Sequence, residues 1–183
     1  MLTNAQVPLL GFAAFSDTGK TTLLASLLPL LRQRGLRIGV IKHARHGFDI
    51  DHPGKDSYVL REAGASQMLI GAPQRWALVT ETPGQGDPKL DDLLPHLDQR
   101  HLDCILVEGF KHELFPKIEL HRPSRGYPLL CLSDETIIAV ASDGPLAVEV
   151  QLPLLDLNNP LQIVDFTYHS LFGDASRQAQ KPE

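Results

Sequence analysis

Short apolar runs alternate with longer amphipathic segments along the chain. Residues 9–15 (LLGFAAF) form a continuous apolar run, which is typical of a strand buried on both faces of a sheet. In residues 21–34 leucines recur at helical spacing, and Gly35 predicts the end of a helix that Pro29 should bend. The same criteria predict further strands at 36–42, 67–72, 76–80, 102–107, 117–121 and 137–141, and helices at 55–63 and 90–97.

Strands separated by helix-length segments indicate an α/β domain with a mainly parallel sheet flanked by helices. Residues 76–80 and 117–133 lack an obvious preceding helix, so antiparallel pairing or a small appendage is expected there. The segment 83–88 (PGQGDP) has the composition of a turn. We expect one domain over residues 1–170, followed by a polar C-terminal tail at 171–183 that is frayed from Ser170 onward.

Composition narrows the class of protein. With 183 residues, 43% of them hydrophobic, the chain can fold without a disulfide or structural metal. A net charge of −5 does not favour a nucleic-acid or membrane-surface partner, and Cys104 and Cys131 sit in apolar runs typical of reduced core thiols. The longest apolar stretch, 23–31, is too short to span a bilayer, and residues 1–15 lack the positive charge of a signal peptide. A cytoplasmic protein is expected.

Residues 14–22 (AFSDTGKTT) lie between the first apolar run and the first amphipathic helix. They form a Walker A motif in which Ala14 stands at the first glycine position. Backbone N–H groups of such a loop converge on an anion, and the helix dipole adds positive potential. Gly19 would allow close approach to phosphates, Lys20 would reach the β- and γ-phosphates, and the Thr21 hydroxyl would ligate magnesium. The sequence therefore predicts a P-loop NTPase-like fold.

A second part of a nucleotide site is expected where a neighbouring strand ends. Glu108 follows the apolar run 102–107 directly, and Gly109 permits a tight exit. A carboxylate at this place can hold magnesium, in this case through a water molecule. Lys111 could contact phosphate or be solvated.

The polar segment after the strand at 36–42 is open to several interpretations. It could be a switch-like loop in which Asp49 or Asp51 contacts magnesium or orders water, a transition-metal site, or a solvated loop. Its chemistry-bearing residues are His43, His46, Asp49, Asp51, His52 and Asp56.

Two later segments end in polar groups that could face a ligand. Thr80, Glu81 and Thr82 close one predicted strand, and Ser142 and Asp143 follow another. Asp143 could accept hydrogen bonds from guanine N–H groups, or it could cap a turn.

Five segments in this order resemble the MobB family of molybdopterin-guanine dinucleotide biosynthesis adaptor proteins, over about residues 7–165. The more specific of them are the segments IKH…DHPGKDS and LVEGFKH, and Asp17 stands where the family's loop is expected to carry glycine. The five segments are AFSDTGKTTLL, VIKHARHGFDIDHPGKDSYVLREAGA, RWALVTETP, ILVEGFKHE and AVASD.

The resemblance implies a GTP-binding protein with weak, magnesium-dependent GTPase activity. It implies a homodimer that assists a MobA-type guanylyltransferase in joining GMP to molybdopterin, and so a molybdopterin or molybdenum cofactor ligand. Carried over, Lys20 and Glu108 would be the catalytic residues, and Thr21, Glu108 and Asp49 the metal contacts. The expected nucleotide contacts are Ser16, Asp17, Thr18, Gly19, Lys20, Thr21, Thr22 and Asp49, with Glu81 and Asp143 as further candidates.

Three other functions use the same motifs. A small-molecule kinase would need lid arginines, for which Arg45, Arg61 and Arg75 are the scattered candidates. A metal-insertion GTPase would use the histidine-rich segment. In the third, nucleotide binding without hydrolysis would shape a surface for a partner.

Overall fold

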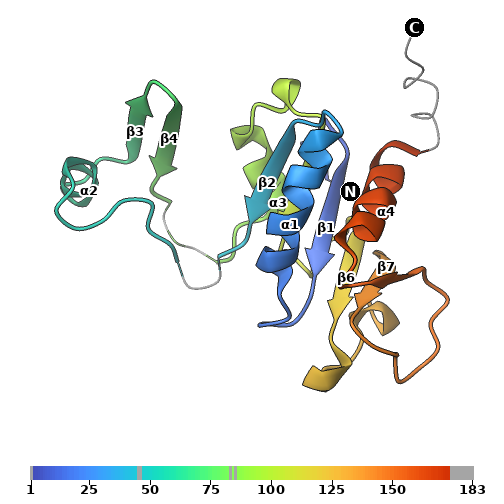
Figure 1. Ribbon diagram of the computed structural model, residues 1–183. Coiled ribbons are helices and arrows are strands. Elements are labelled where there is room, and N and C mark those ends of the chain that lie inside the picture. Colours follow the sequence, from blue (N-terminus) through green and yellow to red (C-terminus); the bar gives the residue numbers. More distant parts are fainter. Residues whose placement is uncertain (1, 45–46, 83, 85, 174–183) are drawn as a thin grey trace, which may run out of the picture. The chain divides into compact units, whose positions relative to one another are not determined.

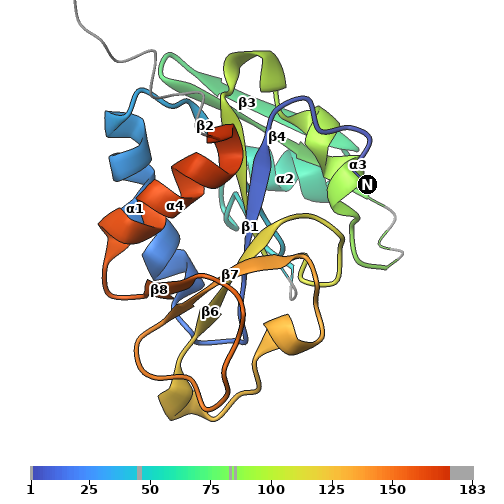
Figure 2. The same cartoon turned by 90° about the vertical axis from the view of Figure 1, so that its right-hand side faces the viewer.

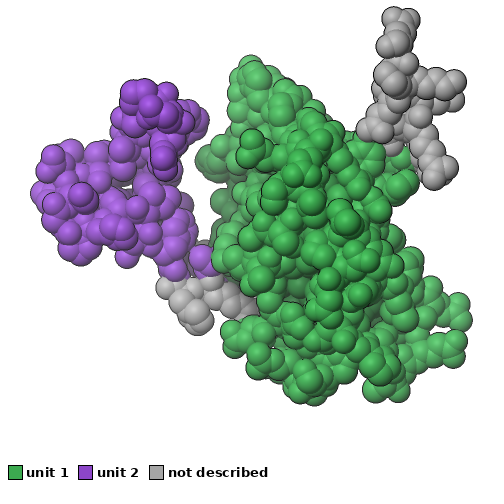
Figure 3. Space-filling view, viewed as in Figure 1, with its two compact units in different colours: residues 1–43, 88–183 green, residues 44–87 purple. Residues whose placement is uncertain are grey.

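The structure, a computed structural model, describes residues 2–44, 47–82, 84 and 86–173 (Figure 1). Of the residues singled out above, Arg45, His46, Pro83, Gln85 and the tail residues 174–183 lie outside this description. The chain divides into two compact units, one of residues 1–43 and 88–183 and one of residues 44–87 (Figure 3).

The first unit is built on a six-stranded parallel sheet with the strand order β2-β5-β1-β6-β7-β8. The apolar runs that predicted buried strands form its centre, so the predicted fold class is confirmed. In register, Phe12 of β1 lies beside Glu108 of β5, and Lys42 of β2 lies on the other side of Glu108. The strands are β1 (Leu9–Ala13), β2 (Ile38–Lys42), β5 (Cys104–Glu108), β6 (Lys117–His121), β7 (Ile137–Ser142) and β8 (Leu154–Asp156).

Helices cover both faces of this sheet (Figure 2). On one face, α1 (Lys20–Gln33) and α4 (Pro160–Phe172) bury their apolar stripes against Leu10 and Phe12 of β1. On the other face, α3 (Leu90–Leu93) and the 3₁₀ turn η1 (Leu94–His96) pack on Ile105 and Val107 of β5. None of the described helices is both long and apolar enough to cross a bilayer.

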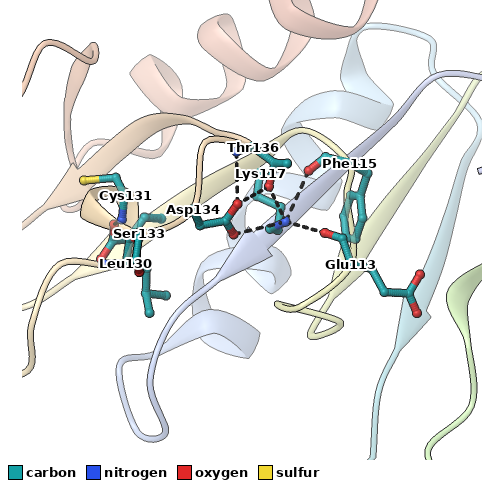
Figure 4. A network of polar contacts seen from close by, with 9 residues as sticks. Glu113, Phe115, Lys117, Leu130, Cys131, Ser133, Asp134 and Thr136 are labelled. Atoms are coloured by element: carbon teal, nitrogen blue, oxygen red, sulfur yellow. Dashed lines mark hydrogen bonds and ion pairs between the residues drawn. The ribbon is translucent and has the colours of Figure 1, made fainter. Parts of the chain in front are cut away.

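The connection from β6 to β7 contains the 3₁₀ turns η3 (Pro123–Arg125) and η4 (Leu130–Leu132) in place of a helix. Its backbone groups need partners that a helix would have supplied internally. Glu119, a buried side chain of β6, supplies two of them by accepting the N–H groups of Leu130 and Cys131, each at 2.8 Å. The buried Lys117 ammonium donates to the side-chain hydroxyl of Thr136, just before β7 (Figure 4).

The second unit consists of α2 (Asp56–Glu62) and an antiparallel hairpin of β3 (Gln67–Ala72) and β4 (Arg75–Thr80). The antiparallel pairing expected at 76–80 is confirmed. At 117–133 the expectation of antiparallel pairing or an appendage is wrong, because β6 pairs in parallel with both β1 and β7.

Other differences from the sequence prediction have local causes. The helix predicted at 90–97 is α3 followed by η1, because Pro95 has no N–H for a fourth-residue hydrogen bond. Helix α1 continues through Pro29, and Gly35 ends it in a left-handed conformation (φ 83°) as predicted. Helix α4 and strand β8 were not predicted, and α4 makes residues 170–172 helical rather than frayed.

Candidate functional site

The Walker A segment, residues 14–22, runs from the carboxyl end of β1 to the first residues of α1. Its backbone makes a sharp turn in which Asp17 (φ 59°) and Gly19 (φ 96°) are both left-handed. Aspartate is one of the few side chains that tolerate this conformation, which accounts for its standing where glycine is expected. Asp17 is exposed, so its carboxylate has access to solvent at this turn.

The first turn of α1 presents backbone N–H groups with positive potential. Gly19 is the N-cap and has no side chain to accept from them, and the first turn carries no acidic residue. The Lys20 ammonium folds back across the segment, donating to the carbonyls of Ala14 at 3.2 Å and Phe15 at 3.0 Å. Thr18 also donates to the Phe15 carbonyl, at 2.8 Å. The segment thus brings an ammonium group and the N-terminus of α1 together, a combination suited to an anion.

Strands β2 and β5 bring Lys42 and Glu108 next to Thr21 of the Walker A segment. The Thr21 hydroxyl donates to Glu108 Oε1 at 2.9 Å. Lys42 Nζ lies 3.5 Å from Thr21 Oγ1 and 3.6 Å from Glu108 Oε1, so the carboxylate has a cationic neighbour. A hydroxyl and a carboxylate oxygen at this spacing are the hard oxygen donors that Mg²⁺ prefers, so the residues present fit that ion.

The exit from β5 is fixed by close packing against His43. The Glu108 carbonyl accepts the His43 N–H at 2.9 Å, and the Phe110 ring stacks on the imidazole at a centroid distance of 4.9 Å. A Cβ on Gly109 (φ 100°) would come within 2.7 Å of the His43 Cβ, so only glycine fits. His43 therefore helps to hold the strand end that carries Glu108.

Two arginines of the β6–β7 connection contact the Walker A segment on the side of β1 opposite to β5 and Glu108. Sequence analysis missed both. Arg122 follows β6; its Nε donates to the Thr18 carbonyl at 2.8 Å and its Nη1 pairs with Asp143 after β7. Arg125 Nη2 donates to the Asp17 carbonyl at 3.4 Å. Their position after a predicted strand could have indicated them, because polar residues just beyond the ends of parallel strands gather at one edge of the sheet. Asp143, expected as a guanine contact, is here the partner of Arg122.

An aromatic pair lies beside the same segment. Phe15 stacks on Tyr127 with ring centroids 4.6 Å apart, and the Lys111 ammonium lies 5.3 Å from the centre of the Phe15 ring. Lys111 is therefore neither free in solvent nor at hydrogen-bond distance from the Walker A backbone, but held by a cation–π contact.

Three predicted site residues, Asp49, Asp51 and Glu81, belong to the second unit, where their carboxylates lie around Arg61. This guanidinium lies 2.8 Å from Glu81, 3.1 Å from Asp51 and 3.7 Å from Asp49. Arg61, a candidate lid arginine, is thus engaged with carboxylates of its own unit. The described residues contain no group of three or more His, Cys, Asp or Glu side chains placed to hold a metal ion.

Comparison with known proteins identifies the family. The profile described as "MobB: Molybdopterin guanine dinucleotide synthesis protein B" matches residues 9–143. The chain belongs to the MobB family. It is 51% identical over 167 residues to the molybdopterin-guanine dinucleotide biosynthesis adapter protein of Escherichia coli (strain K12), covering 91% of this chain and 94% of that protein. The protein of the same description from Haemophilus influenzae is 47% identical over 163 residues, covering 89% of each chain.

Solved MobB structures share the fold. The crystal structure of Bacillus subtilis MobB superposes with a TM-score of 0.73 and 26% identity, covering 91% of this chain and 99% of that one. A structure described as molybdopterin-guanine biosynthesis protein B (mobB) gives a TM-score of 0.70 at 24% identity, covering 89% and 98%. The resemblance to the MobB family and the P-loop NTPase-like fold, both expected from the sequence, are confirmed.

Proposed function

We propose that this protein is a GTP-binding adapter of molybdopterin-guanine dinucleotide biosynthesis. In this proposal it assists a MobA-type guanylyltransferase that joins GMP to molybdopterin, and it hydrolyses GTP slowly with Mg²⁺. Membership in the MobB family supports the place in this biosynthesis, since the relatives are described as its adapter proteins.

The observation that carries the nucleotide part is the hydrogen bond between Thr21 and Glu108 at the N-terminus of α1. Thr21 and Glu108 would hold Mg²⁺, which when bound would neutralise charge on the nucleotide phosphates. Lys20 is flexible enough to exchange the carbonyls of Ala14 and Phe15 for phosphate oxygens, which are stronger acceptors because they are charged. Asp49 and Glu81 stay candidate contacts from the second unit.

Slow hydrolysis follows from the groups around this site. The segment after Glu108 reads GFKHELFP and carries no glutamine to orient an attacking water. Arg122 and Arg125 are both bonded to backbone carbonyls of the Walker A segment. We therefore expect turnover well below the ~10 per second reached by GTPases with a complete catalytic set.

Calorimetric titration with GTP and with ATP, in the presence of Mg²⁺, tests the nucleotide assignment. We expect GTP to bind more tightly than ATP. Lys20→Ala should weaken GTP at least about tenfold, since it removes a charge-assisted hydrogen bond to phosphate. Lys89→Ala, at an exposed lysine before α3, is the matched control and should bind as the wild type does. A preference for ATP would overturn the guanine assignment.

A coupled assay tests the adapter role. Formation of the guanine dinucleotide by a MobA-type enzyme would be measured with wild-type protein, Lys20→Ala and Glu108→Gln. Loss of stimulation with Lys20→Ala is expected. If Glu108→Gln stops hydrolysis but still stimulates, nucleotide binding alone suffices. Equal stimulation by Lys20→Ala would contradict a nucleotide-dependent adapter.

The proposal includes a homodimer. On the described hairpin, Leu69 and Leu78 are directly opposite one another and Trp76 lies on the same face, with exposed fractions of 64%, 44% and 70%. These three residues are termed the apolar hairpin face. Exposed apolar patches of this kind mark protein interfaces, and a second copy of the chain is the partner proposed.

A further inference from the structure

We infer that Arg122 is a positioning residue, which aims the backbone N–H groups of the Walker A segment at bound phosphate, with Asp143 as its anchor and Arg125 as its companion. Arg122 and Arg125 together are termed the arginine clamp. The inference rests on the proposed nucleotide binding, but the ordering of the loop by the clamp can be measured without nucleotide.

The geometry of one peptide group carries the inference. Arg122 Nε donates to the Thr18 carbonyl at 2.8 Å. In a trans peptide the carbonyl and the following N–H point in opposite directions, so fixing the Thr18 oxygen also fixes the Gly19 N–H. Gly19 is the N-cap of α1, so its N–H stands at the helix N-terminus, where an anion would be bound. The guanidinium thus orients a donor that it does not itself touch.

Arg125 acts on the preceding peptide group. Its Nη2 donates to the Asp17 carbonyl at 3.4 Å, which constrains the Thr18 N–H in the same way, though more weakly at this distance. Both peptides lie in the turn in which Asp17 and Gly19 are left-handed, and at Asp17, which has a Cβ, this conformation costs free energy and needs support from its surroundings. The arginine clamp supplies that support from outside the turn.

Asp143 determines where the guanidinium lies. His121 and Ser142 are paired in register at the ends of β6 and β7, so Arg122 and Asp143 come next to each other. The carboxylate pairs with Nη1 while Nε faces Thr18, and this fork is a geometry that lysine cannot reproduce. The guanidinium also packs against Gly19, where an added Cβ would meet Nη2 at 3.5 Å. Asp143 therefore acts on nucleotide through Arg122 and not by reading the base.

Two measurements on the full chain test this inference. In the free protein, backbone ¹⁵N relaxation order parameters of Thr18 and Gly19 are measured in wild type, Arg122→Gln, Arg122→Lys and Asp143→Asn. We expect the Gly19 order parameter to fall from about 0.85, typical of rigid backbone, toward about 0.6 in Arg122→Gln, with a smaller decrease in Arg122→Lys. Calorimetry with GTP and ATP should give at least about tenfold weaker binding of both nucleotides in Arg122→Gln and Asp143→Asn.

The control is Arg100→Gln. Arg100 is an exposed arginine of the 3₁₀ turn η2 (Gln99–His101), and it pairs with Asp98. This variant should leave both readouts at their wild-type values. An unchanged Gly19 order parameter in Arg122→Gln would overturn the clamp. A loss of affinity for GTP but not for ATP in Asp143→Asn would also overturn it, because that result assigns Asp143 to the guanine base. If the wild type binds no nucleotide, the proposed function fails while the order parameters still decide the clamp.

Discussion

Lys117 is a fully buried ammonium whose neighbours satisfy it (Figure 4). It donates to the Glu113 carbonyl at 2.6 Å and lies 3.2 Å from Asp134 Oδ2. Burial alone would raise the pKa of Asp134, but the hydrogen bonds from Thr136 and the ion pair with Lys117 hold it below its ordinary value. The pair ties the segment after Glu108 to the segment before β7.

At this site we predict a pH-dependent loss of stability. Asp134→Asn should cost about 2–4 kcal/mol at pH 7, because it leaves the Lys117 ammonium buried without a counter-charge. Since the folded pKa of Asp134 is lowered, its stabilisation is present above the unfolded value of about 3.9 and is lost as the pH falls further. Denaturant unfolding of both proteins between about pH 7 and pH 3 measures this difference, which should shrink on acidification.

The double variant Lys117→Met/Asp134→Asn is the control. Without the charge it should recover part of the loss, since an uncharged pair avoids the cost of an unpaired buried ion. A cost for Asp134→Asn that stays the same down to pH 3 would mean that the ion pair is not its source.

The burial of the charged side chains of β6 could not be predicted from the sequence. The segment KIELH was predicted as a strand, and it is one, but charged residues at alternate positions would ordinarily face solvent. Lys117, Glu119 and His121 are instead buried. Glu119 accepts backbone N–H groups of the connection that follows β6, and Lys117 pairs with Asp134 at its end. Partners such as Thr18 and Arg122, 104 positions apart, likewise have no local pattern to announce them.

At the scale of elements, the ends of neighbouring strands are fitted to one another. Residues 9–15, 36–42 and 102–107 were predicted as strands because continuous apolar runs suit strands covered on both faces. Strand β8 is three residues long, too short to carry a periodic signal. The way that β2 and β5 end together, with His43 against Gly109, depends on the register between strands that are remote in sequence.

We predict that this fit tolerates no side chain at position 109. Gly109→Ala combines a left-handed backbone with a 2.7 Å contact to the His43 Cβ, so unfolding free energy should fall by about 2–4 kcal/mol. Gly35→Ala is the matched control, because Gly35 is also left-handed (φ 83°) but has nothing within 4 Å of an added Cβ. It should cost only about 1 kcal/mol. Equal losses in denaturant unfolding would show that the backbone conformation alone matters.

At the scale of the whole molecule, the groups that carry the nucleotide proposal and the apolar hairpin face lie in different units. The Walker A segment, Glu108 and the arginine clamp all belong to the first unit, whereas the apolar hairpin face belongs to the second. Nucleotide binding and self-association should therefore respond to different substitutions. The sequence predicted strands at 67–72 and 76–80, with antiparallel pairing or a small appendage at the second. It could not show that one face of the hairpin is exposed, because exposure depends on what the rest of the chain covers.

Trp76→Glu tests this division. An exposed fraction of 70% makes Trp76 the largest apolar group of the hairpin face, and burying a side chain of this size contributes about 2–3 kcal/mol to association. Sedimentation velocity should find a dimer for the wild type and a monomer for Trp76→Glu. Leu161→Glu, at an exposed leucine of α4 in the first unit, should remain a dimer.

Because the proposed GTP contacts of the Walker A segment are left intact, monomeric Trp76→Glu should keep its affinity for GTP. A variant that stays dimeric would place the interface elsewhere, and one that loses GTP would tie the nucleotide site to the assembled dimer.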